Sequence, residues 1–253
     1  MTVNSTAEIQ KRAAAGRITW AGPLIMLVAR SVLAMICQSL VAAIFFPGSA
    51  DAWNQAGEWW RIYGTAIDAG CLALLVWLAH REGIRLFDLG GYNRERWLHD
   101  ALIGLGLFVP LLLAFAVPTV LVETILYRGP APVPGTSLPL AGSLYALLIW
   151  PIIWAFAEDS TYFGYSLPRL EALTGRRWLA VLMVSFFTAL QHIFLPLRLE
   201  WPWIASHFLG YVLGAVVYCL LYLRWRRLLP VHVSHWAINL VGVIMVIVSA
   251  VGR

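Results

Sequence analysis

Two adjacent carboxylates, Glu158 and Asp159, lie inside an otherwise apolar stretch of this sequence. The residues from 144 to 157 carry no charge, and those after Asp159 stay mostly apolar and aromatic up to Leu167. A charged side chain in hydrocarbon is energetically expensive, so such residues are rare and commonly mark a functional site. The pair is therefore the first candidate for chemistry.

Other polar groups in apolar runs can join this pair. Counted from the nearest arginine-bearing loop at about 1.5 Å of rise per residue, four groups share a depth of roughly 12–22 Å: Glu158, His192, His235 and Asn239. His235 and Asn239 are four residues apart and share a helix face. Glu158 and Asp159 are about 100° apart around a helix, so only one of them can point squarely at a given site.

These residue types predict a hydrolase. A carboxylate in apolar surroundings can act as a general base on water, so Glu158 is the candidate base, with His192 helping to hold the water. His235 and Asn239 are candidates to stabilise an oxyanion, because His and Asn donors serve in that role. Asp159 is expected to support them.

A metal version of the same site stays open. Glu158, His192 and His235 form a His₂Glu set of the kind that binds catalytic zinc. We expect no cofactor, and a divalent zinc ion held by these three residues is the alternative.

The sequence motifs of other intramembrane protease classes are absent. No Gly-x-Ser nucleophile lies in an apolar run, and the Gly-x-Gly-Asp setting of the aspartyl type is absent. The H-E-x-x-H motif of zinc proteases is also absent.

The composition predicts a helical membrane protein. Of the 253 residues, 60% are hydrophobic and 12% are charged, whereas soluble domains are about 25% charged. The net charge of +5 comes from residues in short loops beside apolar runs, which is typical of membrane orientation and does not indicate a nucleic-acid partner. We expect an all-α, polytopic bundle that forms a single membrane domain over residues 1–253.

A membrane span needs about 20 apolar residues, and the pattern predicts seven. Their expected ranges are 18–46, 59–80, 100–126, 143–170, 178–197, 201–223 and 229–251. An eighth, re-entrant or split segment is an alternative. With the N-terminus in the cytoplasm, thirteen of the eighteen Lys and Arg residues fall in inside loops and four fall outside, as the positive-inside rule requires.

Arg30 and Asp68 form a second polar pair within the apolar runs. Each is thirteen residues from a flanking arginine, Arg17 and Arg81 respectively, so the two lie at equal depth on neighbouring helices. We interpret them as a structural ion pair that ties the first span to the second.

Three motifs occur in order on successive expected helices. Glu158–Gly164 reads Glu-Asp-Ser-Thr-Tyr-Phe-Gly and is similar to E-E-x-x-[FWY]-R-G. Thr188–His192 is similar to F-x-x-x-H, and His235–Asn239 fits H-x-x-x-[ND]. In this order the motifs resemble the CPBP family of type II CAAX prenyl endopeptidases and bacteriocin-processing proteins, also called Abi. The resemblance covers residues 142–245.

The resemblance implies intramembrane endopeptidase activity. It implies that Glu158 and His192 bind the catalytic water, and that His235 and Asn239 form the oxyanion site.

The sequence departs from the family motifs at three positions. Asp159 replaces the second Glu, Thr188 replaces the Phe, and Phe163 replaces the Arg. If the family's arginine supports the acidic pair, Arg169 is a candidate to take its place.

We therefore expect an intramembrane endopeptidase that acts on a peptide or lipidated peptide among membrane lipids. A prenylated CAAX peptide is implied by the resemblance alone, and a bacteriocin leader fits equally. The expected location is the bacterial plasma membrane, with the site reached from the cytoplasm. The sequence gives no indication of the oligomeric state.

Two alternatives stay open. Phe163 favours an inactive, CPBP-like scaffold or immunity protein. A small proton-linked transporter would need polar residues spread along a path and an inverted repeat, whereas the sequence has its polar residues at one level and no repeat.

Overall fold

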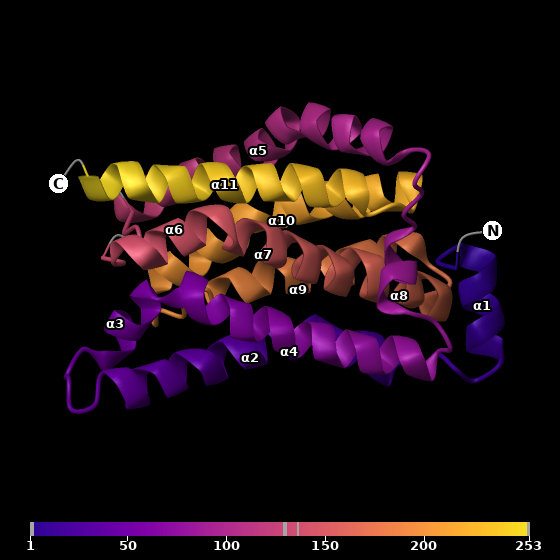
Figure 1. Cartoon of the computed structure of the whole chain (residues 1–253), viewed down its shortest axis with the longest axis horizontal. Helices are drawn as coiled ribbons and strands as arrows, with labels where there is room; N and C mark the ends of the chain where they lie inside the picture. The colour runs from indigo at the N-terminus through magenta and orange to yellow at the C-terminus, as the bar shows by residue number, and fades with distance from the viewer. Residues whose placement is uncertain (1–2, 129–130, 136, 252–253) are drawn as a thin grey trace.

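The computed structural model describes residues 3–128, 131–135 and 137–251, and these form a helical bundle, as the composition predicts (Figure 1). The α-helices, in chain order, are α1 (Thr6–Ala14), α2 (Ala21–Phe45), α3 (Ala52–Glu58), α4 (Trp60–Arg81), α5 (Trp97–Tyr127), α6 (Leu140–Leu148), α7 (Trp150–Asp159), α8 (Leu167–Thr174), α9 (Arg177–Ile193), α10 (Trp201–Trp225) and α11 (Leu229–Val251). A 3₁₀ helix, η1 (Leu86–Gly90), follows α4, and a π-helix, η2 (Ser160–Ser166), joins α7 to α8.

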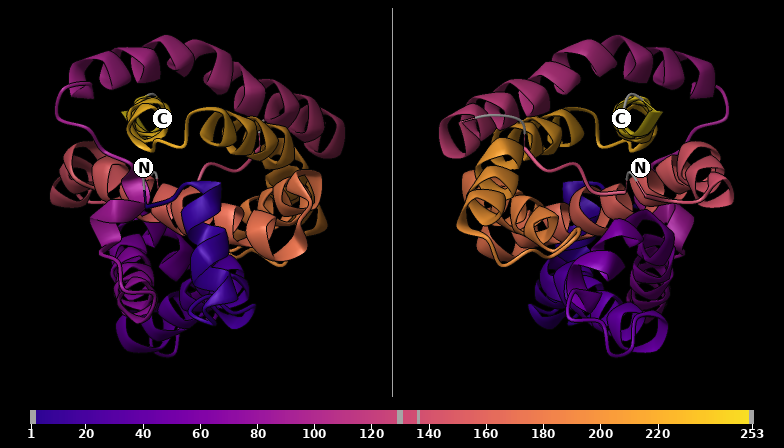
Figure 2. Two further views of the ribbon diagram at one scale, coloured as in Figure 1. Left: turned by 90° about the vertical axis from the view of Figure 1, so that its right-hand side faces the viewer. Right: turned by 90° about the vertical axis from the view of Figure 1, so that its left-hand side faces the viewer.

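The bundle has a middle layer between two outer groups of helices. Helices α7, α9 and α10 run through the middle, and the antiparallel pair α2 and α4 lies along one side of them (Figure 1). On the other side α5 arches over α10 and α11, as the end-on views show (Figure 2). The helices that carry the four candidate groups therefore lie between α4 and α5.

Each of the seven expected spans contains helix, but not all are equally long. Five helices, α2, α4, α5, α10 and α11, are long and apolar enough to cross a membrane. Helix α6 and the continuous stretch α7–η2–α8 (Trp150–Thr174) also pass if they are one span broken by a 45° bend. Helix α9 has 17 residues, about 26 Å of helix. The count of seven spans and the cytoplasmic N-terminus therefore stay predictions.

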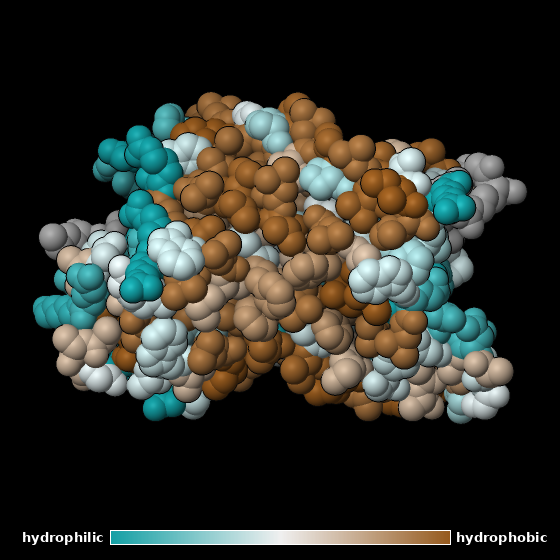
Figure 3. Space-filling model, turned by 180° about the vertical axis from the view of Figure 1, so that it is seen from behind, coloured by the Kyte–Doolittle hydropathy of each residue, from teal (hydrophilic) through white to brown (hydrophobic). Residues whose placement is uncertain are grey.

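The surface supports burial in lipid. Hydrophobic residues cover the middle of the molecule, and hydrophilic residues gather towards its two ends (Figure 3). Helix α5 is the most exposed span, since only 6% of its most apolar window is buried. Large apolar side chains such as Leu102, Val109 and Leu121 are more than half exposed along it. A water-soluble protein rarely exposes such a continuous apolar face.

Two glycines let α5 approach α10 closely. Gly210 and Gly214 are four residues apart on α10, and a Cβ at either position would overlap Thr119 or the ring of Phe115 on α5. Small residues at this spacing are typical of tightly packed membrane helices, where close backbone approach provides the van der Waals contact.

The arginine-bearing loops meet at one end of the bundle. Glu82, after α4, accepts hydrogen bonds from Nε (2.8 Å) and Nη2 (2.6 Å) of Arg169. It also forms an ion pair with Arg12 of α1 at 2.9 Å. At the same end Arg226 pairs with Glu171, and Arg227 pairs with Asp100. We call this the arginine-rich end.

The segment after the acidic pair departs from α-helical geometry. Pro168 has no N–H to donate, and the carbonyl of Gly164 is instead bonded by Nδ2 of Asn4 (2.6 Å) and Nη1 of Arg169 (3.4 Å). Within η2 the hydroxyl of Ser166 donates to the carbonyl of Thr161 at 2.8 Å. Side chains thus satisfy carbonyls at a place where the regular helical pattern changes.

Arg30 is the point where four helices are joined. Its side chain is fully buried on α2, and Nη1 lies 2.6 Å from Oδ1 of Asp68 on α4. Its Nε donates to Oε1 of Gln191 on α9 at 2.7 Å, and its guanidinium lies 4.3 Å from the ring centroid of Trp154 on α7. The predicted pairing with Asp68 is therefore confirmed.

This junction makes a prediction about stability. Asp68→Ala breaks the close buried pair and leaves Arg30 with only Glu158, 3.8 Å away, as counter-charge, which costs about 3–5 kcal/mol. The double variant Arg30→Ala/Asp68→Ala removes both charges and is expected to recover part of that loss. Thermal unfolding of the purified variants in one detergent measures both effects. A double variant no more stable than Asp68→Ala contradicts the pairing energetics.

Candidate active site

The four candidate groups on three helices line one cavity of about 230 Å³. Its wall includes Glu158 of α7, His192 of α9, and His235 and Asn239 of α11. The depth count from the sequence predicts this convergence. The rest of the wall is largely aromatic: Trp60, Phe115, Trp150, Trp154, Tyr211 and Tyr218.

Glu158 reaches the cavity from a nearly closed setting. It is 2% exposed, and its Oε2 atom has no hydrogen-bond partner among the described residues. Nη2 of Arg30 lies 3.8 Å from that oxygen and is also without a partner. The guanidinium of Arg30 therefore lies beside the carboxylate without forming a hydrogen bond to it. The Oε2 atom remains free to accept a proton or a hydrogen bond from water.

His192 presents one ring nitrogen to the cavity. Its Nδ1 lies 2.8 Å from the carbonyl oxygen of Thr188. A carbonyl only accepts, so Nδ1 carries the hydrogen and the neutral ring has its lone pair on Nε2. The ring stacks on Tyr211, with centroids 3.7 Å apart and an interplanar angle of 23°. This stacking fixes the direction in which Nε2 can accept a hydrogen bond.

Asp159 does not line the cavity, and it binds two histidines of α11. Its Oδ1 lies 2.8 Å from Nδ1 of His235, and its Oδ2 lies 2.8 Å from Nδ1 of His232. A carboxylate accepts at both oxygens, so each histidine donates from Nδ1. The two neighbouring carboxylates therefore serve different partners, as their angular separation on a helix requires.

Asn239 offers an unused donor beside His235. Its Nδ2 is buried and has no partner among the described residues, and it lies one helical turn beyond His235. His235 and Asn239 thus present a ring nitrogen and an amide N–H to the same cavity.

The sequence reasoning left His232 outside the site, and the structure connects it to the acidic pair. Beyond its bond to Asp159, His232 has Nε2 2.8 Å from the hydroxyl of Tyr92. Partial burial and, less strongly, the charge of Asp159 raise the pKa of Tyr92, so its hydroxyl stays protonated and donates to Nε2. The three-residue spacing from His235 was a signal for this shared face.

Two further cavity residues were not among the predicted site residues. His207 lines the wall and stacks on Trp203 with ring centroids 3.6 Å apart. Arg61, at the start of α4, lines the wall near Pro134. Their positions near helix ends gave no sign that the cavity reaches so far along the bundle.

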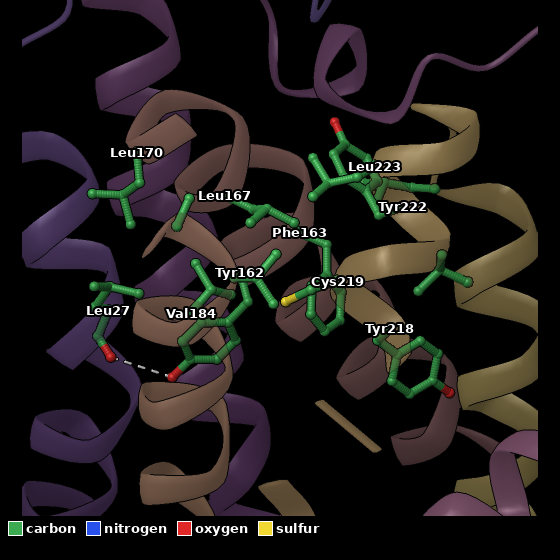
Figure 4. Packing of buried hydrophobic residues seen from close by; sticks show 14 of the residues in the cluster. Leu27, Tyr162, Phe163, Leu167, Leu170, Val184, Tyr218, Cys219, Tyr222 and Leu223 are labelled. Atoms are coloured by element: carbon green, nitrogen blue, oxygen red, sulfur yellow. Dashed lines mark hydrogen bonds between the residues drawn. The ribbon is translucent and has the colours of Figure 1, made fainter. Parts of the chain in front are cut away.

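Phe163, at the position of the family's arginine, makes an apolar contact. Phe163 is 1% exposed and stacks on Tyr218, with ring centroids 5.5 Å apart (Figure 4). Arg169 does not take the place of that arginine, because its guanidinium is engaged with Glu82 at the arginine-rich end. Arg30 is the arginine that faces Glu158.

The zinc arrangement finds no geometric support. Within the described parts of the chain, no three His, Cys, Asp or Glu side chains are grouped so that they could hold a metal ion. We therefore derive no step through a metal.

Comparison with known proteins identifies the segment that carries the site. No curated protein and no solved structure matches the chain. Residues 140–241 match the family described as type II CAAX prenyl endopeptidase Rce1-like. This range contains Glu158, Asp159, His192, His235 and Asn239, and it excludes the helices that supply Arg30 and Asp68. The match agrees with the resemblance read from the three motifs, and residues 140–241 are similar to the Rce1-like family of type II CAAX prenyl endopeptidases.

Proposed function

We propose that this protein is an intramembrane endopeptidase that hydrolyses a peptide bond with water activated by Glu158. The observation that carries the proposal is the cavity where a free carboxylate oxygen, a histidine lone pair and two potential oxyanion donors face one space. These are the parts that hydrolysis by an activated water requires.

The reaction begins with a water molecule held between Oε2 of Glu158 and Nε2 of His192. Glu158 takes a proton as the water oxygen attacks the peptide carbonyl carbon. The C–N bond then breaks, and Glu158 returns the proton to the leaving amine. The cycle starts from the ionised form of Glu158, and the guanidinium of Arg30, 3.8 Å away, lies beside that carboxylate.

The oxyanion is stabilised by Asn239 and His235. Nδ2 of Asn239 donates one hydrogen bond. Since Nδ1 of His235 already donates to Asp159, its Nε2 donates only when the ring carries both protons. The Asp159 carboxylate stabilises that charged ring, so its supporting role is to make His235 a cationic donor.

The substrate class we propose is a peptide or lipidated peptide within the bilayer, consistent with the Rce1-like match. A prenylated CAAX peptide is the first candidate. The expected cytoplasmic access finds no support in the cavity, whose wall extends from Glu158 towards Arg61 and Pro134, away from the arginine-rich end. The orientation of the chain and the plasma-membrane location remain proposals from the arginine distribution.

The general base is tested with Glu158→Gln. We expect cleavage of a farnesylated CAAX peptide by purified protein to fall by about 10²–10⁴-fold, the usual contribution of a general base. Glu123→Gln is the matched control, because Glu123 lies in the apolar helix α5 outside the cavity wall, and it should leave the rate unchanged. Unchanged cleavage by Glu158→Gln would rule out the mechanism.

The oxyanion role is tested with Asn239→Ala. Because the amide acts on charge that develops in the transition state, kcat is expected to fall by about 10²–10³-fold while KM changes little. Steady-state kinetics separate the two parameters. A rise in KM at constant kcat would assign Asn239 to substrate binding instead.

Chelation separates the metal-free mechanism from the zinc alternative. We expect peptide cleavage to survive prolonged dialysis against a strong chelator, because every step above uses the chain's own residues. Loss of activity that added zinc restores would show that Glu158, His192 and His235 act as metal ligands.

The inactive scaffold is a second candidate, favoured by the packing of Phe163 in the apolar core (Figure 4). It is distinguished by cleavage itself. A folded protein that binds peptide and never cleaves it supports the scaffold.

A further inference from the structure

We propose that Arg61 binds the terminal carboxylate of a peptide whose scissile bond lies at Glu158. This inference rests on the proposed function, because it assigns the far end of the same cavity. It names a subsite for the C-terminus of the substrate.

Arg61 is a buried cation whose charge is not used within the fold. It is 7% exposed and lines the cavity. Among the residues that the structure describes, its Nε atom has no partner and its one hydrogen bond runs from Nη1 to the carbonyl of Pro134 at 3.3 Å. Among the described residues no carboxylate lies within ion-pair distance of it. A buried charge without an opposite charge is unfavourable, so an anionic ligand would be bound strongly.

The nearest acidic side chain is engaged elsewhere. Glu58, three residues earlier in the chain, accepts from the backbone N–H of Gly135 at 2.7 Å and pairs with Arg198 at 3.4 Å. It therefore neutralises another arginine and leaves Arg61 available to a ligand.

Aromatic rings hold the guanidinium in place. It lies 4.5 Å from the ring centroid of Trp60 and 5.6 Å from that of Trp150. Stacking on tryptophan fixes the plane of the guanidinium, which can then bind a carboxylate through two parallel hydrogen bonds. The arrangement is suited to a planar carboxylate at a defined position.

The distance from the proposed catalytic groups fits a short peptide end. Arg61 and Asp68 are separated by seven residues of α4, about 10.5 Å of helix, and Asp68 lies at the level of Arg30 and Glu158. An extended chain covers about 3.3–3.6 Å per residue, so three residues span about 10–11 Å. A carboxylate on Arg61 would therefore place the bond three residues upstream beside Glu158.

The cavity between these points suits apolar residues of modest size. Its volume of about 230 Å³ lies below the ~300–1,000 Å³ of typical small-molecule sites. The tryptophans between Arg61 and Glu158 provide an apolar wall, so the released fragment should be a short, apolar peptide with a free carboxylate.

The experiment measures binding separately from cleavage. The Glu158→Gln variant, in a neutral detergent that supplies no competing anionic lipid, is titrated with a labelled apolar peptide carrying an S-farnesyl cysteine followed by three residues. The peptide is used as the free C-terminal acid and as the C-terminal amide. We expect the acid to bind at least ~10-fold more tightly, about 1.4 kcal/mol.

Substitutions at Arg61 test the origin of that preference. Arg61→Gln in the same background should bind acid and amide equally, and Arg61→Lys should retain part of the preference. Arg81→Gln is the matched control, because Arg81 is also on α4 and faces a tryptophan, Trp77, but does not line the cavity. It should keep the full preference.

The outcomes distinguish this subsite from the proposed reaction. Equal binding of acid and amide, binding of neither, or a preference that survives Arg61→Gln overturns the subsite. Cleavage of both peptides at equal rates by the unmodified enzyme overturns the subsite and leaves the hydrolase intact. Binding with the acid preference but without cleavage supports the subsite and contradicts the hydrolase.

Discussion

The buried charge of Arg30 is the constraint on which the arrangement of the site depends. A guanidinium without solvent contact must be surrounded by groups that compensate its charge and donors. Asp68 supplies the counter-charge at 2.6 Å, Gln191 accepts from Nε, and Trp154 faces the guanidinium. Each contact comes from a different helix, so satisfying one side chain fixes α4, α7 and α9 relative to α2. His192 follows Gln191 directly, and Glu158 lies one turn after Trp154. The catalytic candidates are therefore positioned by the same junction that compensates the charge.

Asp159 organises the other half of the site. Its two oxygens accept hydrogen bonds from Nδ1 of His232 and Nδ1 of His235, and these bonds connect α7 to α11. Adjacent carboxylates on one helix would repel each other if both faced one space. The helix separates them by about 100°, with Arg30 beside Glu158 and the two histidines beside Asp159. Each negative charge thus has its own positive or donating partner, and one acidic pair can provide both a base and a support for the oxyanion donor.

Sequence reasoning predicted the depth of polar groups better than their direction. Counting residues placed Glu158, His192, His235 and Asn239 at one level, and they line one cavity; their catalytic roles remain predictions. The same counting paired Arg30 with Asp68. It did not show that Arg30 also faces Glu158, because the azimuth of a side chain depends on how the helices rotate against each other.

The partners of Arg169 and His232 were missed for a related reason. These partners lie in segments without apolar periodicity. Arg169 contacts Asn4 before α1 and Glu82 after α4, and His232 contacts Tyr92 in a loop. A split segment was kept as an alternative from the sequence, but its 45° bend between α6 and α7 could not be placed, since a bend leaves the hydrophobicity of the segment unchanged. Composition determines that the chain is a membrane bundle, whereas these specific contacts require coordinates.

The π-helix after the acidic pair has a consequence for how this sequence can evolve. A π-helical turn holds one more residue than an α-helical turn, because its hydrogen bonds join residues five apart. Deleting one residue from Ser160–Ser166 would let this stretch close as an α-helix, so α7 and α8 would keep nearly the same rotation relative to each other. A residue inserted between Glu158 and Arg169 without such a bulge would instead rotate Arg169 by about 100° relative to Glu158. Arg169 would then leave Glu82, or Asp159 would leave its histidines. The extra residue of the π-helix therefore lets the chain lose one residue here and keep the site coupled to the arginine-rich end, whereas it cannot gain one in regular helix.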